Sequence, residues 1–391
     1  MKTDETLRKI PVRSTLRKTP ARSHAILLLL AALLAAAGLS CMGGDDRPNV
    51  LFIVWDTTRA DRMSLFGYEK KTTPFLDEWA QGARVFENCT STGSSTVPAH
   101  GAMFTGLLPT EHGANNSFKC LADQHVTLAE IFRDNGYDTY LFSANPHISA
   151  DENFHQGFDT EEHPWDRKFR DRSVDRAMAA RDGGRGQADG ARLARNRERA
   201  IKMARKRPDN VFIRNSGWMA EEGLREWLAD RGGAKKPFFA FLNYMEAHRP
   251  YSAAEKYCRK TMTPAQIERL KRIDRSWLTS WKYTFGLHEY SEEDLETFNR
   301  LYEACLLELD DLFASLIGAL EKEGRLDNTI IVLVADHGEH LGEHHLLDHQ
   351  YSLYEPLLKV PLVLWWHGHV EPGRETRPVV NFDLFSTLIC K

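Results

Sequence analysis

Two aspartates stand directly behind apolar runs that have the character of buried strands. Asp56 follows residues 49–55, and Asp336 with His337 follows the β-branched run 329–334. Short, uninterrupted apolar runs of this kind predict strands, and open α/β sheets build their sites at the carboxyl ends of strands. If the two strands are neighbours, two carboxylates and an imidazole meet at one edge of the sheet. That donor set suits a divalent metal ion.

A hydroxyl nucleophile is the second part of this chemistry. Thr96 lies two residues before Pro98, and proline favours the first turn of a helix. A helix N-terminus stabilises an anionic intermediate, and a bound metal would lower the pKa of the Thr96 hydroxyl and orient it for attack. Ser95 is a competing nucleophile. Together these residues predict a metal-assisted esterase that acts on a sulfate or phosphate ester.

Several segments, in this order along the chain, resemble the sulfatase family of the alkaline phosphatase superfamily from about residue 47 onward. The family has an aspartate on its first strand, a Cys/Ser-x-Pro-x-Arg motif followed by Thr-Gly, a His-x-Pro-Tyr segment and an Asp-His/Asn-Gly-Glu metal motif. The corresponding positions here are Asp56, 96–100 with 105–106, 248–251 and 336–339. The resemblance implies an α/β fold of the alkaline phosphatase type, with a mostly parallel central sheet flanked by helices.

The resemblance also implies roles for individual residues. The cation, which would be Ca, Mg, Mn or Zn, is expected to be held by Asp56, Thr57, Thr96, Asp336 and His337. His248 and His349 are expected to bind the charged oxygens of the substrate, and many members have a lysine where His349 stands. Thr96, His248 and His100 are the expected catalytic residues, although His100 could instead be a residue of the helix surface.

Two positions depart from the family pattern. Thr96 replaces the Cys or Ser that becomes formylglycine, and His100 replaces the Arg that this modification needs. Threonine cannot form the aldehyde, and a threonine nucleophile resembles instead the lipoteichoic acid synthases and phosphoethanolamine transferases, which pass through a phospho-threonine. The sequence therefore predicts a hydrolase of sulfate or phosphate esters with Thr96 as nucleophile. The alternatives are a phosphoryl-group transferase on a lipid or glycan, and a non-catalytic truncated relative.

Residues 1–46 have the pattern of an export signal followed by a tether. A basic segment precedes the apolar run 25–41, which is short for a membrane span. The end of that run resembles a bacterial lipoprotein processing box, which would leave Cys41 lipidated. We expect an exported protein of a bacterial envelope, either periplasmic or anchored to the membrane by an N-terminal lipid.

The rest of the chain, residues 47–391, is expected to form one catalytic domain with a charged helical insertion at about 160–235. Helical spacing is seen at 74–86, 126–135 and 291–323, and strand patterns at 137–143, 238–244 and 360–366. Relatives continue into a small C-terminal subdomain beyond the point where this chain stops, so that subdomain is expected to be missing. The net charge of −4 gives no reason to expect nucleic acid. The expected partner is a sulfated or phosphorylated small molecule or glycan.

Overall fold

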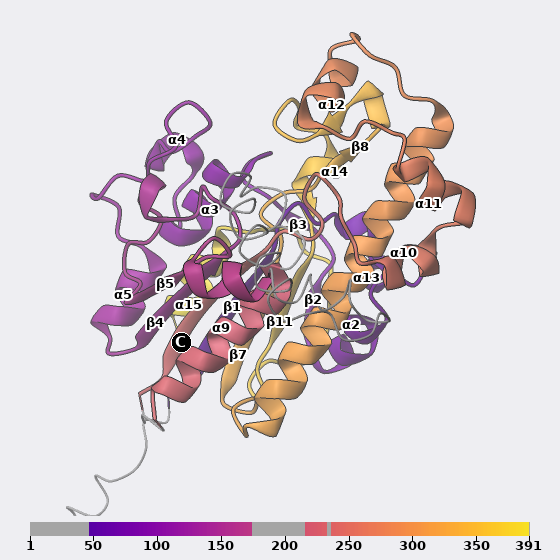
Figure 1. Ribbon diagram of the computed structural model, residues 1–391. Helices are drawn as coiled ribbons and strands as arrows, with labels where there is room; N and C mark the ends of the chain where they lie inside the picture. Colours follow the sequence, from indigo (N-terminus) through magenta and orange to yellow (C-terminus); the bar gives the residue numbers. More distant parts are fainter. Residues whose placement is uncertain (1–46, 174–215, 233–235, 391) are drawn as a thin grey trace, which may run out of the picture. The chain divides into compact units, whose positions relative to one another are not determined.

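The computed structural model describes residues 47–173, 216–232 and 236–390 (Figure 1). The predicted export segment and the greater part of the predicted charged insertion lie outside these ranges. Within the described ranges, no helix combines the length and the apolar character needed to cross a bilayer.

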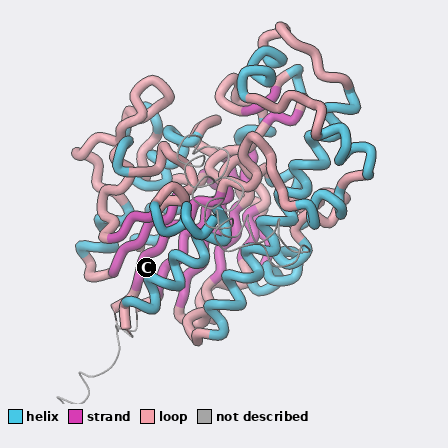
Figure 2. The backbone as a smooth tube through the Cα atoms, in the orientation of Figure 1, coloured by secondary structure: helices cyan, strands magenta, loops and turns pink. Residues whose placement is uncertain are grey.

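A mixed, mostly parallel sheet forms the centre of the domain (Figure 2). All of its neighbouring strands run parallel except where β11 pairs, antiparallel, with β2 and β7. This confirms the predicted α/β class. The strand order is β12 (Gly373–Glu375), β2 (Arg84–Phe86), β11 (Leu362–Trp365), β7 (Thr329–Val334), β1 (Asn49–Trp55), β6 (Phe238–Tyr244), β4 (Asp138–Ser143) and β5 (Thr160–Glu162).

The two predicted site strands are neighbours. β1 pairs with β7 on one side and with β6 on the other, and the register places Val54 opposite Val334 and Trp55 opposite Tyr244. The chain therefore leaves β1 and β7 at the same level and in the same direction. This register brings Asp56 and Asp336 to one edge of the sheet, as the sequence predicted.

Helices cover both faces of the sheet because the side chains of a strand alternate between its faces. In β1, Leu51, Ile53 and Trp55 belong to one hydrophobic core, and the residues between them, Val50, Phe52 and Val54, belong to the other. The first core is completed by α2 (Pro74–Trp79), α9 (Ser216–Asp230) and α13 (Glu292–Lys322). The second is completed by α3 (Thr96–Thr105), α5 (Leu128–Asp134) and α15 (Asp383–Ile389).

Smaller elements surround this framework. The short strands pair in two further sheets, one of three strands in the order β10-β3-β13 and one formed by β8 and β9. The remaining α-helices and strands are α4 (Pro109–His112), α10 (Glu255–Thr261), α11 (Pro264–Leu270), α12 (Trp277–Thr284), α14 (Glu355–Leu358), β3 (Cys89–Thr90), β8 (His340–Leu341), β9 (Leu347–Asp348), β10 (Lys359–Val360) and β13 (Val379–Val380).

One predicted helix is wrong over half its length. The spacing at 74–86 predicted a single helix, but α2 ends at Trp79 and β2 begins at Arg84. In β2 only the middle residue, Val85, is buried, so its burial alternates with a period of two, as in a strand. By contrast, the helical spacing at 291–323, which allowed one or two helices, corresponds to the single long helix α13, and Ser291 caps it in a capping box with Asp294.

The turn behind β7 requires a glycine, because a Cβ at Gly338 would lie 1.9 Å from the carbonyl oxygen of Pro356. We expect Gly338→Ala to lower the free energy of unfolding by about 1–3 kcal/mol, the usual cost of overpacking. Urea denaturation measures this change. The control is Gly318→Ala in α13, where a Cβ meets nothing within 4 Å and alanine should raise the stability by about 0.5–1 kcal/mol. A Gly338→Ala protein as stable as the wild type would contradict the close approach.

Candidate active site

Two buried carboxylates lie at the carboxyl ends of β1 and β7. Asp56 and Asp336 are both 0% exposed. Asp336 Oδ1 accepts hydrogen bonds from the backbone N–H groups of Thr57, at 3.2 Å, and His337, at 2.8 Å. Asp56 Oδ2 accepts a bond of 2.8 Å from Asn145. The remaining oxygen of each carboxylate has no hydrogen-bond partner, so each aspartate keeps one oxygen available to a ligand.

His337 completes a group of three metal-ligating side chains. Its Nδ1 lies 2.9 Å from the carbonyl oxygen of Gly338. A proton on Nδ1 would be donated to that oxygen, which leaves the Nε2 lone pair for a metal. His337 Nε2 has no hydrogen-bond partner and lies 3.3 Å from Asp336 Oδ2. The ligand atoms of Asp56, Asp336 and His337 all lie within 4.8 Å of one another.

The electrostatics of this group fit a divalent cation. Burial and the charge of Asp56 raise the pKa of Asp336 well above its usual range, because two carboxylates in one buried site repel each other. Burial lowers the pKa of His337 to about 3, so its imidazole is neutral, the form that binds metals. A divalent ion between the carboxylates would replace their repulsion by attraction.

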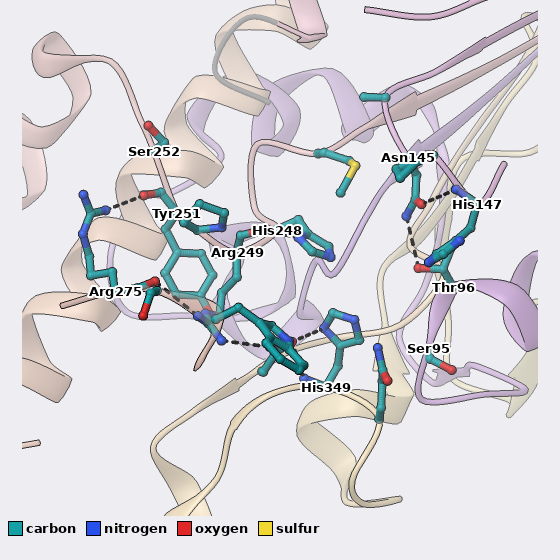
Figure 3. Close-up of a pocket in the computed structure, with 18 of the residues that line it drawn as sticks. Ser95, Thr96, Asn145, His147, His248, Arg249, Tyr251, Ser252, Arg275 and His349 are labelled. Carbon is teal, nitrogen blue, oxygen red and sulfur yellow. Dashed lines mark hydrogen bonds and ion pairs between the residues drawn. The ribbon is translucent and has the colours of Figure 1, made fainter. Parts of the chain in front are cut away.

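Thr96 is the first residue of α3 and lies beside the carboxylates. Its side chain is almost fully buried, and its Oγ1 accepts a hydrogen bond of 3.1 Å from the Asn145 amide (Figure 3). The hydroxyl of Ser95, the competing nucleophile, donates instead to Asn116 Oδ1 at 3.0 Å. Of the two hydroxyls, only Thr96 is connected through one amide to Asp56.

His248 and His349 face the same cavity as Thr96, and their ring centroids lie 5.1 Å apart (Figure 3). The cavity has a volume of about 1520 Å³. His248 Nδ1 lies 2.5 Å from the carbonyl oxygen of Arg249, which turns Nε2 away from the backbone. Burial lowers the pKa of His349, but the neighbouring Asp348 and Glu339 raise it well above its usual range. Both predicted substrate-binding histidines therefore line the cavity.

The other two predicted site residues, His100 and Thr57, are buried and do not line the cavity. His100 is fully buried, so the alternative of a helix-surface residue is wrong. Its Nδ1 lies 3.0 Å from the Thr96 carbonyl oxygen and 3.5 Å from Asp336 Oδ2, and it is absent from the lining of the cavity. This place suits a positioning residue behind the carboxylate. Thr57 has a buried hydroxyl without a hydrogen-bond partner, and its backbone N–H holds Asp336.

The sulfatase family profile matches residues 48–389, nearly the whole described chain. The chain belongs to the sulfatase family. Among curated sulfatases, an uncharacterised member of Escherichia coli (strain K12), YidJ, is 24% identical over 368 residues, which cover 88% of this chain and 67% of YidJ. Membership of this family makes the protein a sulfuric or phosphoric ester hydrolase by class.

Solved structures with the same fold include hydrolases and a transferase. The phosphonate monoester hydrolase of Agrobacterium radiobacter superimposes with a TM-score of 0.65 at 23% identity, over 88% of this sulfatase-family chain and 73% of that chain. The soluble domain of lipooligosaccharide phosphoethanolamine transferase A from Neisseria meningitidis gives 0.59 at 17% identity, over 89% and 88% of the two chains. At these identities the likeness concerns the fold.

Asn145 is a site residue of this sulfatase-family protein that the sequence did not reveal. It lies two residues beyond β4, and its amide donates both to Asp56 Oδ2 and to Thr96 Oγ1. The available signal was the one that identified Asp56, a polar residue just after a buried strand. Because β4 pairs with β6, which pairs with β1, residues after these three strands meet at one edge.

We expect Asn145→Ala to lower kcat by about 10²–10³-fold, the usual loss when one preorganised donor is removed. The metal content should stay unchanged, because Asn145 is not a metal ligand. The matched control is Asn243→Ala, since Asn243 donates to Asp56 Oδ2 at 3.3 Å but makes no bond to Thr96. Steady-state kinetics of the two variants separate the contact with Thr96 from the contact with Asp56. Equal losses in both would contradict a specific role at Thr96.

Proposed function

We propose that this protein is an exported, metal-dependent hydrolase of sulfate or phosphate esters in which Thr96 is the nucleophile. One observation carries the proposal: a single amide, Asn145, joins the Thr96 hydroxyl to Asp56 beside an open cavity. The residues that would hold the cation are Asp56, Thr57, Thr96, Asp336 and His337. When bound, a divalent ion would lower the pKa of the Thr96 hydroxyl and offset charge on the ester oxygens.

The chain's own residues would perform the remaining steps. The Asn145 amide holds Thr96 Oγ1, which gives its proton to water and forms a bond to the sulfur or phosphorus as the bond to the leaving oxygen breaks. His248 donates a proton to that leaving oxygen, and His349 binds the non-bridging oxygens. The N-terminus of α3 favours the negative charge at Thr96. Water then attacks the sulfur or phosphorus, which releases the sulfate, phosphate or phosphonate product and returns a proton to Thr96 Oγ1.

The threonine favours a phosphorus ester over a sulfate ester. A sulfatase with formylglycine expels sulfate by elimination from the aldehyde hydrate, and the methyl-bearing carbon of Thr96 offers no such route. A phospho-threonine, in contrast, is open to attack by water at phosphorus. The alternative is a phosphoryl-group transferase on a lipid or glycan. It is supported by the fold shared with the soluble domain of the Neisseria meningitidis transferase, 88% of which this chain covers.

The cavity supports an extended, negatively charged substrate. Besides the catalytic side chains, its lining includes cationic and aromatic residues, namely Lys119, His147, Trp165, Lys271, Arg275 and Trp277. Trp277 is 62% exposed, and an exposed indole beside cationic groups suits a sugar ring that carries anionic substituents. We propose a sulfated or phosphorylated small molecule or glycan as substrate.

The proposed export rests on residues 1–46, and a lipid on Cys41 would anchor the protein to the membrane of a bacterial envelope. Fractionation of cells that express the full chain, beside a variant that lacks residues 1–46, tests this. Both proteins found in the cytoplasm would argue against export.

The test of the function is turnover on matched aryl esters. The metal-loaded protein is assayed with one aryl group carried as a sulfate ester, a phosphate diester and a phosphonate monoester. We expect turnover of the phosphorus esters, with kcat/KM at least tenfold above that for the sulfate ester. Higher activity on the sulfate would exclude our preference for phosphorus. Transfer to an added alcohol in place of water would favour the transferase, and no turnover on any ester would leave a non-catalytic relative.

A further inference from the structure

A second cluster of metal-ligating side chains lies beside the first. Glu339, Asp348 and His349 are all buried, and their ligand atoms lie within 4.8 Å of one another. The small hairpin of β8 and β9 builds this cluster. Its register sets His340 opposite Asp348, so the next pair outward brings Glu339 and His349 face to face. The turn that carries Asp336 and His337 thus also brings Glu339 to the hairpin strand that carries Asp348 and His349.

Glu339 is the residue of this cluster whose carboxylate lacks a hydrogen-bond partner. Its side chain is 0% exposed, and neither of its carboxylate oxygens has a hydrogen-bond partner. A buried carboxylate without compensation destabilises a folded protein. The nearest cationic candidate is His349 Nδ1, at 3.5 Å from Glu339 Oε1. That distance is long for a hydrogen bond.

His349 cannot satisfy both carboxylates by itself. Its Nδ1 lies 2.8 Å from Asp348 Oδ1, and a single N–H on that nitrogen points at one oxygen only. An imidazolium bound to Asp348 therefore leaves both oxygens of Glu339 unpaired. A divalent cation, in contrast, accepts the Nδ1 lone pair and one oxygen of each carboxylate at the same time.

Arg249 fixes Asp348 in the orientation that such a site needs. The Arg249 guanidinium, itself buried, donates to Asp348 Oδ2 at 2.8 Å. The other oxygen, Oδ1, stays directed at His349. Partners of this kind, which hold a ligand through its second atom, commonly orient metal ligands.

We infer that Glu339, Asp348 and His349 form a second divalent-cation site next to the Asp56, Asp336 and His337 group. The rings of His337 and His349 have centroids 4.5 Å apart, so the two sites adjoin, and Asp348 and His349 of the second site line the cavity. One imidazole and two carboxylates suit Zn²⁺ or Mn²⁺ better than Ca²⁺ or Mg²⁺, because imidazole is a borderline ligand. The site requires the histidine at position 349, where many family members have a lysine.

The test counts ions in the full-length protein after chelation and reloading with Zn²⁺. Elemental analysis should find about two ions per wild-type chain, about one in His349→Lys and about one in Asp336→Asn. Lysine keeps a positive charge beside Glu339 and Asp348 but cannot ligate when protonated. It therefore preserves the ion pair and removes only the metal site. Circular dichroism and thermal melting confirm that each variant is folded.

A second readout does not depend on counting. With Mn²⁺, electron paramagnetic resonance of the wild type should show a spin-coupled pair, and His349→Lys should show isolated ions. Glu339→Gln, close in shape, should weaken the second ion at least tenfold. If the wild type binds about one ion and His349→Lys binds the same, the cluster is an ion pair and the inference is wrong. Loss of that single ion in Asp336→Asn would then still support the first site.

Discussion

Thr96→Ala should lower kcat/KM on the preferred ester by at least about 10³-fold, because removal of the group that forms the covalent bond leaves only binding and charge stabilisation. The structure gives this change few other consequences. Thr96 Oγ1 has one hydrogen bond, from Asn145, and Asp56, Asp336 and His337 remain to hold the cation. Steady-state kinetics with a parallel measurement of metal content test this. Lost turnover with retained metal is the expected pair of results.

Thr96→Ser and Ser95→Ala are the controls for this experiment. Thr96→Ser keeps a hydroxyl at the same atom and should retain activity within about tenfold. Ser95→Ala removes the hydroxyl next along the chain, which bonds Asn116 and not Asn145, and should change the rate little. If Ser95→Ala abolished turnover while Thr96→Ala did not, the nucleophile would be Ser95.

A covalent intermediate offers direct support for the same assignment. Rapid acid quenching during turnover of a phosphorus ester, followed by mass spectrometry of the peptide that contains Thr96, should reveal phosphate on that residue. The peptide from Thr96→Ala is the blank. A phosphate on Ser95 in the wild type, or on no residue under conditions of full turnover, would argue against the proposed role.

The part of the site that the sequence predicted lies where short, uninterrupted apolar runs end. Asp56 and Asp336 follow short apolar runs whose strand character is unambiguous, and parallel neighbours bring their ends to one edge. The fold class follows from the same alternation of buried strands and helices. The prediction of one helix at 74–86 failed because a short 3-10 turn, Ala80–Gly82, separates α2 from the strand β2, and apolar residues such as Trp79 and Val85 fit both a helical and a strand pattern.

The residues that the sequence missed depend on tertiary contacts. Asn145 stands in no motif, and its two hydrogen bonds join β1 to α3, which are far apart along the chain. The pairing of Glu339 with His349 depends on the register of the hairpin of β8 and β9, whose strands have two residues each. No spacing in the sequence determines that register. The sequence did name His100 as a site residue, but it left open a place on the helix surface, which the packing of His100 against Phe241 excludes.

Removal of the metal should lower the stability of the protein as well as its activity. The free oxygens of Asp56 and Asp336 and the free nitrogen of His337 face one buried point. An ion that binds only the folded chain stabilises it by about 2.7 kcal/mol at a concentration 100 times its dissociation constant. We expect chelation to lower the thermal midpoint by several degrees and to abolish turnover, and readdition of metal to reverse both. Differential scanning calorimetry with and without chelator measures the first effect.

Asp336→Asn removes the negative charge of the side chain and keeps nearly the same shape. The asparagine oxygen can accept the same two N–H bonds as Oδ1, and its amide can donate to His337 Nε2, which lies 3.3 Å from the replaced oxygen. The variant also ends the repulsion that raises the pKa of Asp336. Without metal it should therefore be at least as stable as the metal-free wild type, yet gain less than the wild type when metal is added, because only the second cluster can still bind. If metal stabilised Asp336→Asn as much as the wild type, the ion would lie elsewhere. If metal-free Asp336→Asn were less stable than the metal-free wild type, repulsion between the carboxylates would not explain why this site needs a cation.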